Sequence, residues 1–454
     1  MASTYLTRTN GSAVTAERKQ FTISFWVKRS ATGVEHALCS AGNGGGSEEF
    51  SIRFESSDRL DIFHYTNSYQ GRLITNRKFR DTNAWYHIYF LSDTANGTAG
   101  DRMQLYINGV RETSFATNQN ASQNDLLPWN VDERHQIGSN SWNNSGNGAD
   151  HLNGCMSHFY NVAGSIIDVS QFGSTDSTTG EWKINTSPTI ASYGTAGFLV
   201  LKDGNTVTDQ SPNSNNFTVG GGTLTKTEDC PSNVFATLNP LNSFYSGATF
   251  SNGNNRVSLT SGTYAAVSST LGFNSGKWYA EFKAADATNW VQVGIVAQNP
   301  TASGQPLGYF SDSYGYIGGT AAGGVNSLMN NDSNTSYAST YGNGDIISVA
   351  VDCDNNKLYF GLNGTWLNSG NPESGATGTG AAFTISSSPT SGFYYFAVGN
   401  YSGSQTPDWE ANFGNGYFGT TAVSSAGTNA SGNGIFEYDV PTGYTALSTK
   451  GLNS

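Results

Sequence analysis

The stretch RMQLYINGVRETSF, residues 102–115, has a near echo in NKLYFGLNGTW, residues 356–366. Each stretch alternates apolar and polar residues, reaches an Asn-Gly pair and continues as a second short run. Because successive side chains of a strand point to opposite faces, Met103, Leu105 and Ile107 share one face. Asn-Gly suits a type I′ turn, in which both central residues need a positive φ. Both stretches therefore predict β-hairpins, and their likeness follows from turn chemistry rather than from internal duplication.

The rest of the chain has the same texture. Good helix formers are scarce, 55 of the 454 residues are glycine, and aromatic residues make up 13%. Gly and Asn separate short aromatic and β-branched runs, which is typical of strands joined by many turns. The length leaves room for two large sandwiches. We therefore expect an all-β protein built from two antiparallel β-sandwiches.

Charge and cysteine content narrow the classes of function. The net charge is −12 and the basic residues form no dense patch, so we expect no nucleic-acid partner. No apolar run is long enough to span a membrane, and the start MASTYLTRTN lacks the apolar core of a secretory signal. The four cysteines, at 39, 155, 230 and 353, show no CxxC spacing, which predicts inert thiols in a reducing compartment.

The first third of the chain resembles a known family. In FTISFWVKRS (21–30), Phe21, Ile23, Phe25 and Val27 alternate with polar or amphipathic residues, which predicts a half-buried strand. This run and those that follow it resemble, in order and spacing, a laminin-G/concanavalin A-like jelly-roll domain, which we place at residues 1–169: AWYHIYFLSDT, DRMQLYINGVRETSF, HQIGS and LNGCMSHFYNV. More narrowly, TYLTRTNGSAVTAERKQFTISFWVKRS and KFRDTNAWYHIYF are similar to the opening domain of virion proteins in tailed phages of marine bacteria.

A second set of alternating runs resembles a SPRY-type sandwich, which we place at residues 246–415. The family's pattern is met by GKWY at 276–279, VGI at 293–295, LYFGLNG at 358–364 and NFG at 412–414. Residues 170–245, rich in Pro, Gly, Asn and Ser, are expected to be a connector, and 416–454 a C-terminal segment; both resemble parts of the same phage proteins. Within the connector, the apolar run FLVL at 198–201 is expected to pack as a strand on one of the sandwiches.

No catalytic constellation stands out. Jelly-roll glucanases place paired carboxylates on one strand with Glu-x-Asp-x-x-Glu spacing, and that spacing is absent here. The nearest acidic positions are Glu48, Glu49, Asp132, Glu133 and Glu410, and adjacent residues of a strand point to opposite faces. The six histidines are scattered along the chain. We therefore expect no enzymatic activity.

Metal binding is not expected either. DCDNN at 352–356 has Asp-x-Asp-x-Asn spacing, but lacks the glycine and the later glutamate of an EF-hand loop, so it predicts a polar turn. Asp93, Asp101 and Asp150 are weak candidates for a calcium site of the kind that concanavalin A-like domains carry at one rim. We predict no metal and no cofactor.

Ligand binding is the favoured chemistry. Sugars offer flat CH faces to aromatic rings and hydroxyl groups to amides and carboxylates. Trp129, Trp142 and Asn143 lie in polar stretches of the first domain, and Tyr309, Tyr314 and Trp366 are the corresponding candidates in the second. Core packing and subunit contact are the alternatives for these aromatic residues.

The resemblance implies a structural protein on the surface of a phage virion, assembled in the host cytoplasm, as a fibre, appendage or decoration. Its expected partners are other virion subunits, further copies of itself and a host-surface glycan. Two alternatives stay open: a polysaccharide depolymerase, and a purely architectural cement protein. Turnover of host polysaccharide separates the first from the others, and glycan binding separates an adhesin from a cement protein.

Overall fold

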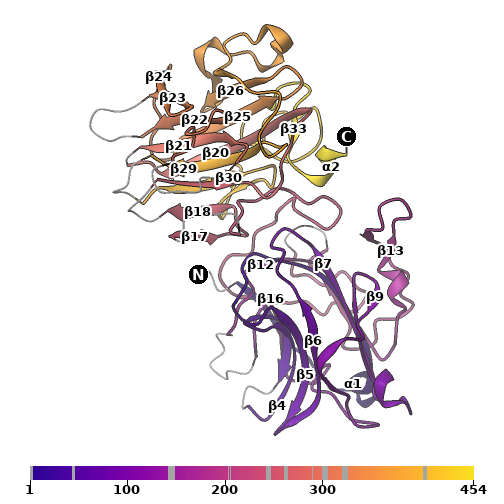
Figure 1. The fold of residues 1–454 in the computed structure, drawn as a ribbon. Helices are drawn as coiled ribbons and strands as arrows, with labels where there is room; N and C mark the ends of the chain where they lie inside the picture. Colours follow the sequence, from indigo (N-terminus) through magenta and orange to yellow (C-terminus); the bar gives the residue numbers. More distant parts are fainter. Residues whose placement is uncertain are drawn as a thin grey trace. The chain divides into compact units, whose positions relative to one another are not determined.

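The computed structural model describes residues 4–453 except 43–45, 142–148, 203, 205, 242–246, 260–263, 289, 299–304, 320–325 and 402–405. The chain divides into two compact units, Met1–Lys226 and Thr227–Ser454. Each unit is a β-sandwich in which nearly all strand pairs are antiparallel, so the predicted fold class is confirmed (Figure 1).

Two large sheets and the two-stranded sheet β13–β14 make up the described part of the first unit. The larger sheet contains, in spatial order, β10 (Phe115–Gln119), β6 (Tyr69–Lys78), β5 (Arg59–Thr66), β4 (Glu48–Phe54), β3 (His36–Gly42), β11 (Arg134–Ile137), β1 (Tyr5–Thr9) and β16 (Thr218–Gly221). The smaller contains β15 (Phe198–Val200), β12 (Gly154–Ala163), β2 (Gln20–Arg29), β7 (Tyr86–Asp93), β8 (Met103–Ile107) and β9 (Val110–Arg111). Shorter elements are α1 (Thr15–Lys19), η1 (Ala99–Asp101), η2 (Val169–Gln171), β13 (Gly173–Thr175) and β14 (Trp182–Ile184).

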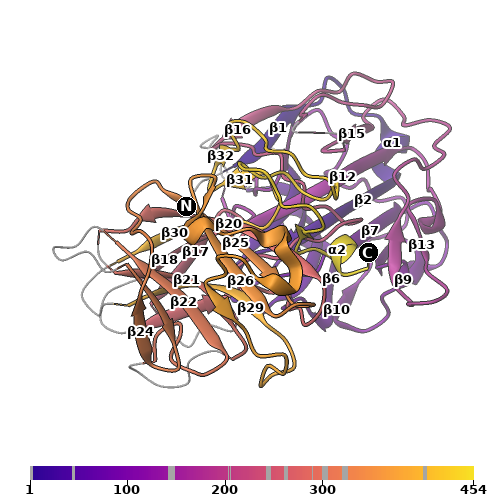
Figure 2. The same ribbon diagram turned by 90° about the horizontal axis from the view of Figure 1, so that it is seen from above.

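The second unit repeats this plan with another strand order. One sheet contains β17 (Ala248–Ser251), β18 (Arg256–Leu259), β30 (Asp408–Asn412), β20 (Lys277–Asp286), β25 (Ile346–Asp352), β26 (Lys357–Leu362) and β27 (Thr365–Trp366), with β28 (Phe383–Thr384) beside β26 and β33 (Thr445–Ala446) beside β20. Figure 2 shows β20, β25 and β26 of this sheet. The other contains β19 (Ala265–Ser268), β29 (Tyr395–Asn400), β21 (Val291–Val296), β22 (Ser313–Gly318), β23 (Ser327–Asn330) and β24 (Ser333–Ser336). Shorter elements are η3 (Leu367–Ser369), η4 (Pro372–Thr377), β31 (Tyr417–Phe418), β32 (Thr421–Ala422) and α2 (Thr449–Leu452).

The two hairpins predicted from Asn-Gly are present. Asn108 and Gly109 have φ values of 49° and 76°, and Asn363 and Gly364 have 48° and 81°, as a type I′ turn requires. The turns join β8 to β9 and β26 to β27. Met103, Leu105 and Ile107 are buried in the core between the two sheets, as their shared face predicts.

The sequence predicts that strand β2 is half-buried, but both of its faces are buried in the structure. Phe21, Ile23, Phe25 and Val27 do point into the core. The opposite face is covered by residues 165–193, whose Phe172 packs with Tyr89 and Tyr160. The Thr22 hydroxyl donates to the Ser165 carbonyl (3.2 Å) and accepts from the Ile167 amide (3.0 Å). A sandwich face that looks solvent-facing in the sequence is therefore buried by a later segment.

The expected connector, residues 170–245, is not a separate segment. Residues 198–201 form β15 against β12, with Phe198 and Val200 fully buried, which confirms the expected strand. Asp209 holds the following loop, since its carboxylate accepts from the Leu199 amide (2.8 Å) and the Asn215 amide (2.7 Å). The β16 strand then pairs with β1. The larger sheet of the first sandwich is therefore completed only by residues 218–221, close to the end of the first unit.

The C-terminal segment, residues 416–454, likewise belongs to the second sandwich. Phe436, Val440 and Tyr444 pack on the outer face of the sheet that contains β20, against Tyr279 and Tyr359. In each unit, therefore, a late segment covers the outer face of one sheet. Each covering segment also places an aromatic ring on a hairpin glycine: Trp182 lies over Gly109, and Tyr438 lies over Gly364. Figure 1 shows β13 beside β9 at the first of these contacts.

All four cysteines are free thiols, in agreement with the prediction against disulfides. Burial raises the pKa of the Cys39 thiol, which makes it unreactive at neutral pH.

Candidate functional site

The outer face of the larger sheet of the first unit, here called the front face, carries a band of polar side chains. Strand register places one row of residues across six strands of this face: Thr7, Gln136, Ser40, Ser51, Phe63 and Arg72. Arg53 and Asp61 lie beside this row as cross-strand partners, and Glu49 pairs with Tyr65 on its other side. Residues between these positions, such as Ile52 and Ile62, point into the core. The alternation of each strand thus separates an apolar core from a polar front face.

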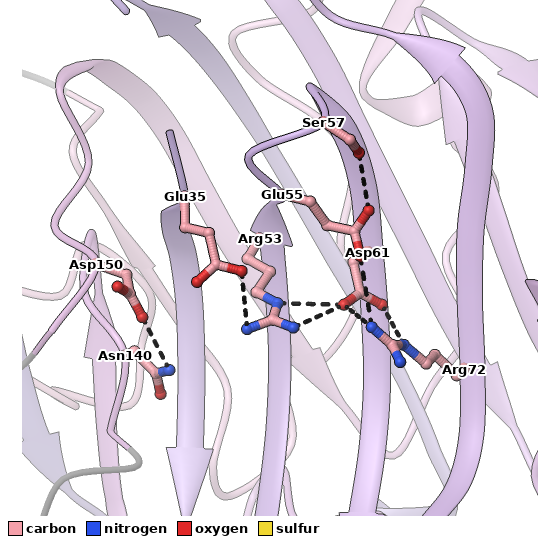
Figure 3. A network of polar contacts seen from close by, with 8 residues as sticks. All are labelled: Glu35, Arg53, Glu55, Ser57, Asp61, Arg72, Asn140 and Asp150. Atoms are coloured by element: carbon pink, nitrogen blue, oxygen red, sulfur yellow. Dashed lines mark hydrogen bonds and ion pairs between the residues drawn. The ribbon is translucent and has the colours of Figure 1, made fainter. Parts of the chain in front are cut away.

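Two arginines of the front face share one buried carboxylate (Figure 3). The Asp61 side chain is 0% exposed and lies between the two guanidinium groups. Arg53 donates to it through Nε and Nη2, both at 3.1 Å, and Arg72 through Nε at 3.0 Å and Nη2 at 2.8 Å. Further out, Arg53 pairs with Glu35 and Arg72 with Glu55, each at 3.5 Å. The Nε and Nη2 donors of both arginines are therefore committed to carboxylates within the chain.

Aromatic rings stand next to this network. The Arg53 guanidinium lies 5.0 Å from the centre of the Phe63 ring, and that of Arg72 lies 4.3 Å from the Tyr69 ring. Tyr69 meets the edges of Phe63 and Tyr65 at 5.6 and 5.4 Å and stays 38% exposed. This arrangement gives the front face a fixed aromatic surface at its rim.

Elsewhere on the front face lie buried polar atoms that have no hydrogen-bond partner. Within the described part of the chain these include the Glu49 Oε1, the Ser51 Oγ, both side-chain amide atoms of Gln136, the Ser141 Oγ and the Arg59 Nε. Ser51 and Gln136 are both 0% exposed. An unpaired buried polar atom costs about 1–3 kcal/mol, and most such atoms in proteins are paired. Several of these atoms lie on the front face of the first sandwich.

The segment around residue 140 forms one side of this region. The Ser40 hydroxyl donates to the Ser139 carbonyl (3.0 Å) and accepts from the Ser141 amide (2.7 Å). Asn140 pairs with Ala149, and the Asp150 carbonyl accepts from the Ala37 amide at 2.7 Å. Figure 3 shows Asn140 and Asp150 on the side of the network where Glu35 lies.

Glu49 carries the most altered acid–base behaviour of this face. Its pKa is raised to about 8: burial is the largest cause, Arg53 opposes the rise, and the nearby Asp150 and Asp61 carboxylates add to it. At neutral pH the carboxyl group is therefore mostly protonated and able to donate a hydrogen bond. It offers a neutral donor and acceptor rather than a charge.

Trp129 is wrong as a ligand-binding residue. It is 0% exposed, and its ring lies 5.4 Å from Phe50 and 4.8 Å from His135 in the core. Its indole N–H donates to the Asn161 side chain at 3.0 Å. The loop that carries it passes through the end of the sandwich, so its polar neighbours in sequence gave a misleading picture of its surroundings. Trp142 and Asn143 lie outside the described residues, between Ser141 and Ala149.

The three candidates of the second unit do not form one site. Tyr314 is wrong as a ligand contact, since it is 4% exposed and its hydroxyl accepts from the Ser386 amide at 2.9 Å. Trp366 is partly buried and packs on the cluster that holds the C-terminal segment. Tyr309 is partly buried in the turn before β22, with its ring against Phe310 at 5.2 Å.

Arg53, Asp61, Arg72 and Gln136 were not predicted from the sequence. The available signal was a charged residue at an outward position between core positions, as in FSIRFE (50–55) and LDIFHY (60–65). Strand order, which brings β4, β5, β6 and β11 into one sheet, was needed to join these positions.

One serine–histidine pair of the first unit has the spacing of a catalytic arrangement. Ser24 and His87 lie 2.8 Å apart (Oγ to Nε2), but the Trp182 indole donates to His87 Nδ1 at 3.1 Å. The imidazole proton is therefore on Nε2, where it points at the serine oxygen, and burial lowers the pKa of His87 to about 3. The pair consequently lacks the acceptor nitrogen that a general base needs.

Within the described ranges, no group of three or more His, Cys, Asp or Glu side chains is placed to hold a metal ion. The predicted polar turn at 352–356 is confirmed, since the Asn355 amide donates to Asp352 at 2.9 Å. None of the helices described has the length and apolar character that a membrane span needs.

Comparison with known proteins supports the class of the first unit. Residues 2–162 match the family model described as the concanavalin A-like lectin/glucanases superfamily. The match covers the first sandwich up to β12, and it confirms the concanavalin A-like architecture expected there. No curated protein matches the chain.

Among solved structures, the chain is similar to the SPRY domain of human HERC1, with 17% identity over 38% of this chain and 96% of that one, and a TM-score of 0.30. A human SPRY domain shows 18% identity over 36% of this chain and 94% of that one, with a TM-score of 0.26. Stonustoxin shows 18% identity over 40% of this chain and 27% of that one, with a TM-score of 0.29.

Proposed function

We propose that this protein is a non-enzymatic adhesin and that the front face of its first sandwich binds a carbohydrate. The observation that carries the proposal is the set of buried, unpaired polar atoms of Glu49, Ser51, Gln136 and Ser141 on the face that carries the partly exposed rim. The lectin-like class of the first unit supports it.

Carbohydrate fits these groups better than an apolar ligand does. Each sugar hydroxyl donates one hydrogen bond and accepts others, as do the serine hydroxyls and the primary amide of the front face. Tyr69 supplies an exposed ring on which the CH face of a sugar can stack. Water that bridges the deepest atoms to the ligand completes the hydrogen bonding.

The setting proposed for this activity is the surface of a phage virion. It rests on the resemblance of the N-terminal stretches to virion proteins, together with a net charge of −12 that disfavours nucleic acid. In this setting the partners are other virion subunits, further copies of the chain and a glycan of the host surface.

The proposal is tested by titrating the purified protein with polysaccharide from the host cell surface in a calorimeter. Replacing Tyr69 by Ala should weaken binding about 3- to 10-fold, because a stacked aromatic pair contributes about 0.5–1.5 kcal/mol. Phe393→Ala, which removes an exposed ring of the second unit, is the matched control and should leave the affinity unchanged. Equal affinities for all three proteins would contradict the front face as the binding site.

Incubation with the same host polysaccharide also tests the two alternatives, a depolymerase and a cement protein. A depolymerase would release new reducing ends during incubation, whereas an adhesin binds without turnover. The front face holds the Asp61 carboxylate in four hydrogen bonds from two arginines, which leaves it poorly placed to attack a sugar. A cement protein would show neither binding nor turnover.

A further inference from the structure

We infer that the front face selects uncharged sugars over their acidic counterparts, an inference that rests on the proposed function. Its basis is how the positive and negative groups of this face are already paired with one another.

Two arginines of the front face, Arg53 and Arg72, are already engaged with carboxylates. Arg53 and Arg72 both donate to Asp61 and have Glu35 and Glu55 as outer partners. Arg134, further along the face on β11, donates from Nη2 to the Ser141 carbonyl at 3.4 Å. A carboxylate or sulfate of a ligand would have to displace Asp61 to reach Arg53 or Arg72 in the same geometry. That displacement would leave a 0% exposed carboxylate without its counter-charges, which is strongly unfavourable.

The outer partners of Arg53 and Arg72 are negative. The Glu35 side chain is 39% exposed, and that of Glu55 is 21% exposed, so each meets an approaching ligand near its arginine. Asp150 adds a third carboxylate beside them (Figure 3). At short range, like charges in a partly desolvated region repel an acidic sugar with little screening by salt.

The unpaired groups of Gln136, Ser51 and Ser141 are uncharged. Gln136 has both a donor and an acceptor free, and the hydroxyls of Ser51 and Ser141 can act in either role. Glu49 adds a carboxyl group that neighbouring carboxylates help to keep protonated. Alternating donors and acceptors without charge are what the hydroxyl groups of a neutral sugar require.

The test uses three pairs of oligosaccharides that share ring stereochemistry and differ at C6: glucan with polyglucuronate, galactan with polygalacturonate, and mannan with polymannuronate. Affinities of the full-length protein are measured by calorimetry at physiological salt. For the pair that binds, the neutral member should bind at least tenfold more tightly. Tyr69→Ala should weaken that binding, which places it on the front face.

A charge variant separates local repulsion from the effect of total charge. Glu35→Gln combined with Glu55→Gln should raise the affinity for the uronate and so reduce the preference for the neutral oligosaccharide. The control, Glu181→Gln with Asp332→Asn, removes the same two charges at exposed positions elsewhere and should leave the preference unchanged.

The outcomes distinguish the two levels of the argument. Equal or tighter binding of the uronate, weakened by Tyr69→Ala, would overturn the selectivity and leave the proposed function in place. Absence of binding to all six oligosaccharides and to host polysaccharide would overturn both.

Discussion

Glu49 is a single residue whose charge is set by the fold. Its folded pKa of about 8 lies above the ordinary glutamate pKa of 4.5, so the folded protein binds more protons than the unfolded chain between these values. The stability that depends on this group is therefore fully present below pH 4.5 and is lost as the pH rises through 8.

Replacement of Glu49 by Gln should accordingly make the first unit more stable than wild type at pH 9. The gain should be a few kcal/mol at most and should shrink toward pH 5, where both side chains are neutral. Chemical denaturation of both proteins at pH 5, 7 and 9 measures this. A difference that does not change with pH would show that Glu49 is charged in the folded protein.

Gly33 and Gly109 illustrate two reasons why a position requires glycine: a left-handed backbone, and a left-handed backbone with no room for a side chain. Both have a φ of 76°, which side chains other than glycine rarely adopt. A Cβ at Gly33 meets nothing within 4 Å, whereas a Cβ at Gly109 would overlap the Trp182 ring.

Gly33→Ala should therefore cost about 1–2 kcal/mol, the price of the left-handed backbone alone. Gly109→Ala should cost about 1–3 kcal/mol more, because Trp182 must move. Unfolding free energies from denaturant titration test the difference. Equal costs would mean that residues around Trp182 do not pack on the hairpin.

At the scale of single residues, the sequence predicts local backbone conformation well. The positive φ of Asn108 and Gly109 follows from residue type and spacing alone. Trp129 was misplaced because its burial depends on Phe50 and His135, which come from distant strands. The front-face pairs Arg53–Asp61 and Arg72–Asp61 depend on strand register, which the sequence of a single strand does not specify.

At the scale of elements, the late segments that cover each sandwich are held by buried polar anchors. Glu281 on β20 is the clearest example, since its carboxylate accepts from the Glu437 and Tyr438 amides, both at 2.8 Å. It also accepts from the Tyr279 hydroxyl and the Asn412 amide. Burial raises the pKa of Glu281 to about 7, and these four donors oppose the rise.

Glu281→Gln should loosen the C-terminal segment, because its amide NH₂ would face donors instead of accepting from them. We expect a loss of about 2–4 kcal/mol and faster hydrogen exchange at residues 437 and 438. Glu373→Gln is the control, since Glu373 also accepts from this segment, at the Thr442 amide (2.7 Å), but in an exposed position. Equal exchange rates in the two variants would contradict an anchoring role for Glu281.

The sequence predicted β15 correctly because four consecutive apolar residues in a polar stretch need a buried place. It did not predict that 165–193 and 416–454 cover outer sheet faces. Their anchors are polar atoms and isolated aromatic residues, which leave no periodic pattern.

At the scale of the whole molecule, the chain divides after Lys226 rather than at a long connector. A fragment of residues 1–226 should fold cooperatively, whereas 1–169 should not, because it lacks β15 and β16. Circular dichroism during thermal unfolding compares them. A cooperative transition in the shorter fragment would show that those two strands are dispensable.

The central claim, that the front face binds carbohydrate, is tested most directly by hydrogen–deuterium exchange of the full-length protein with and without host-surface polysaccharide. Bound ligand should slow exchange in β4, β5 and β6, residues 48–78, while the second unit stays unchanged. Slower exchange confined to the second unit, or no change anywhere at saturating polysaccharide, would contradict the account.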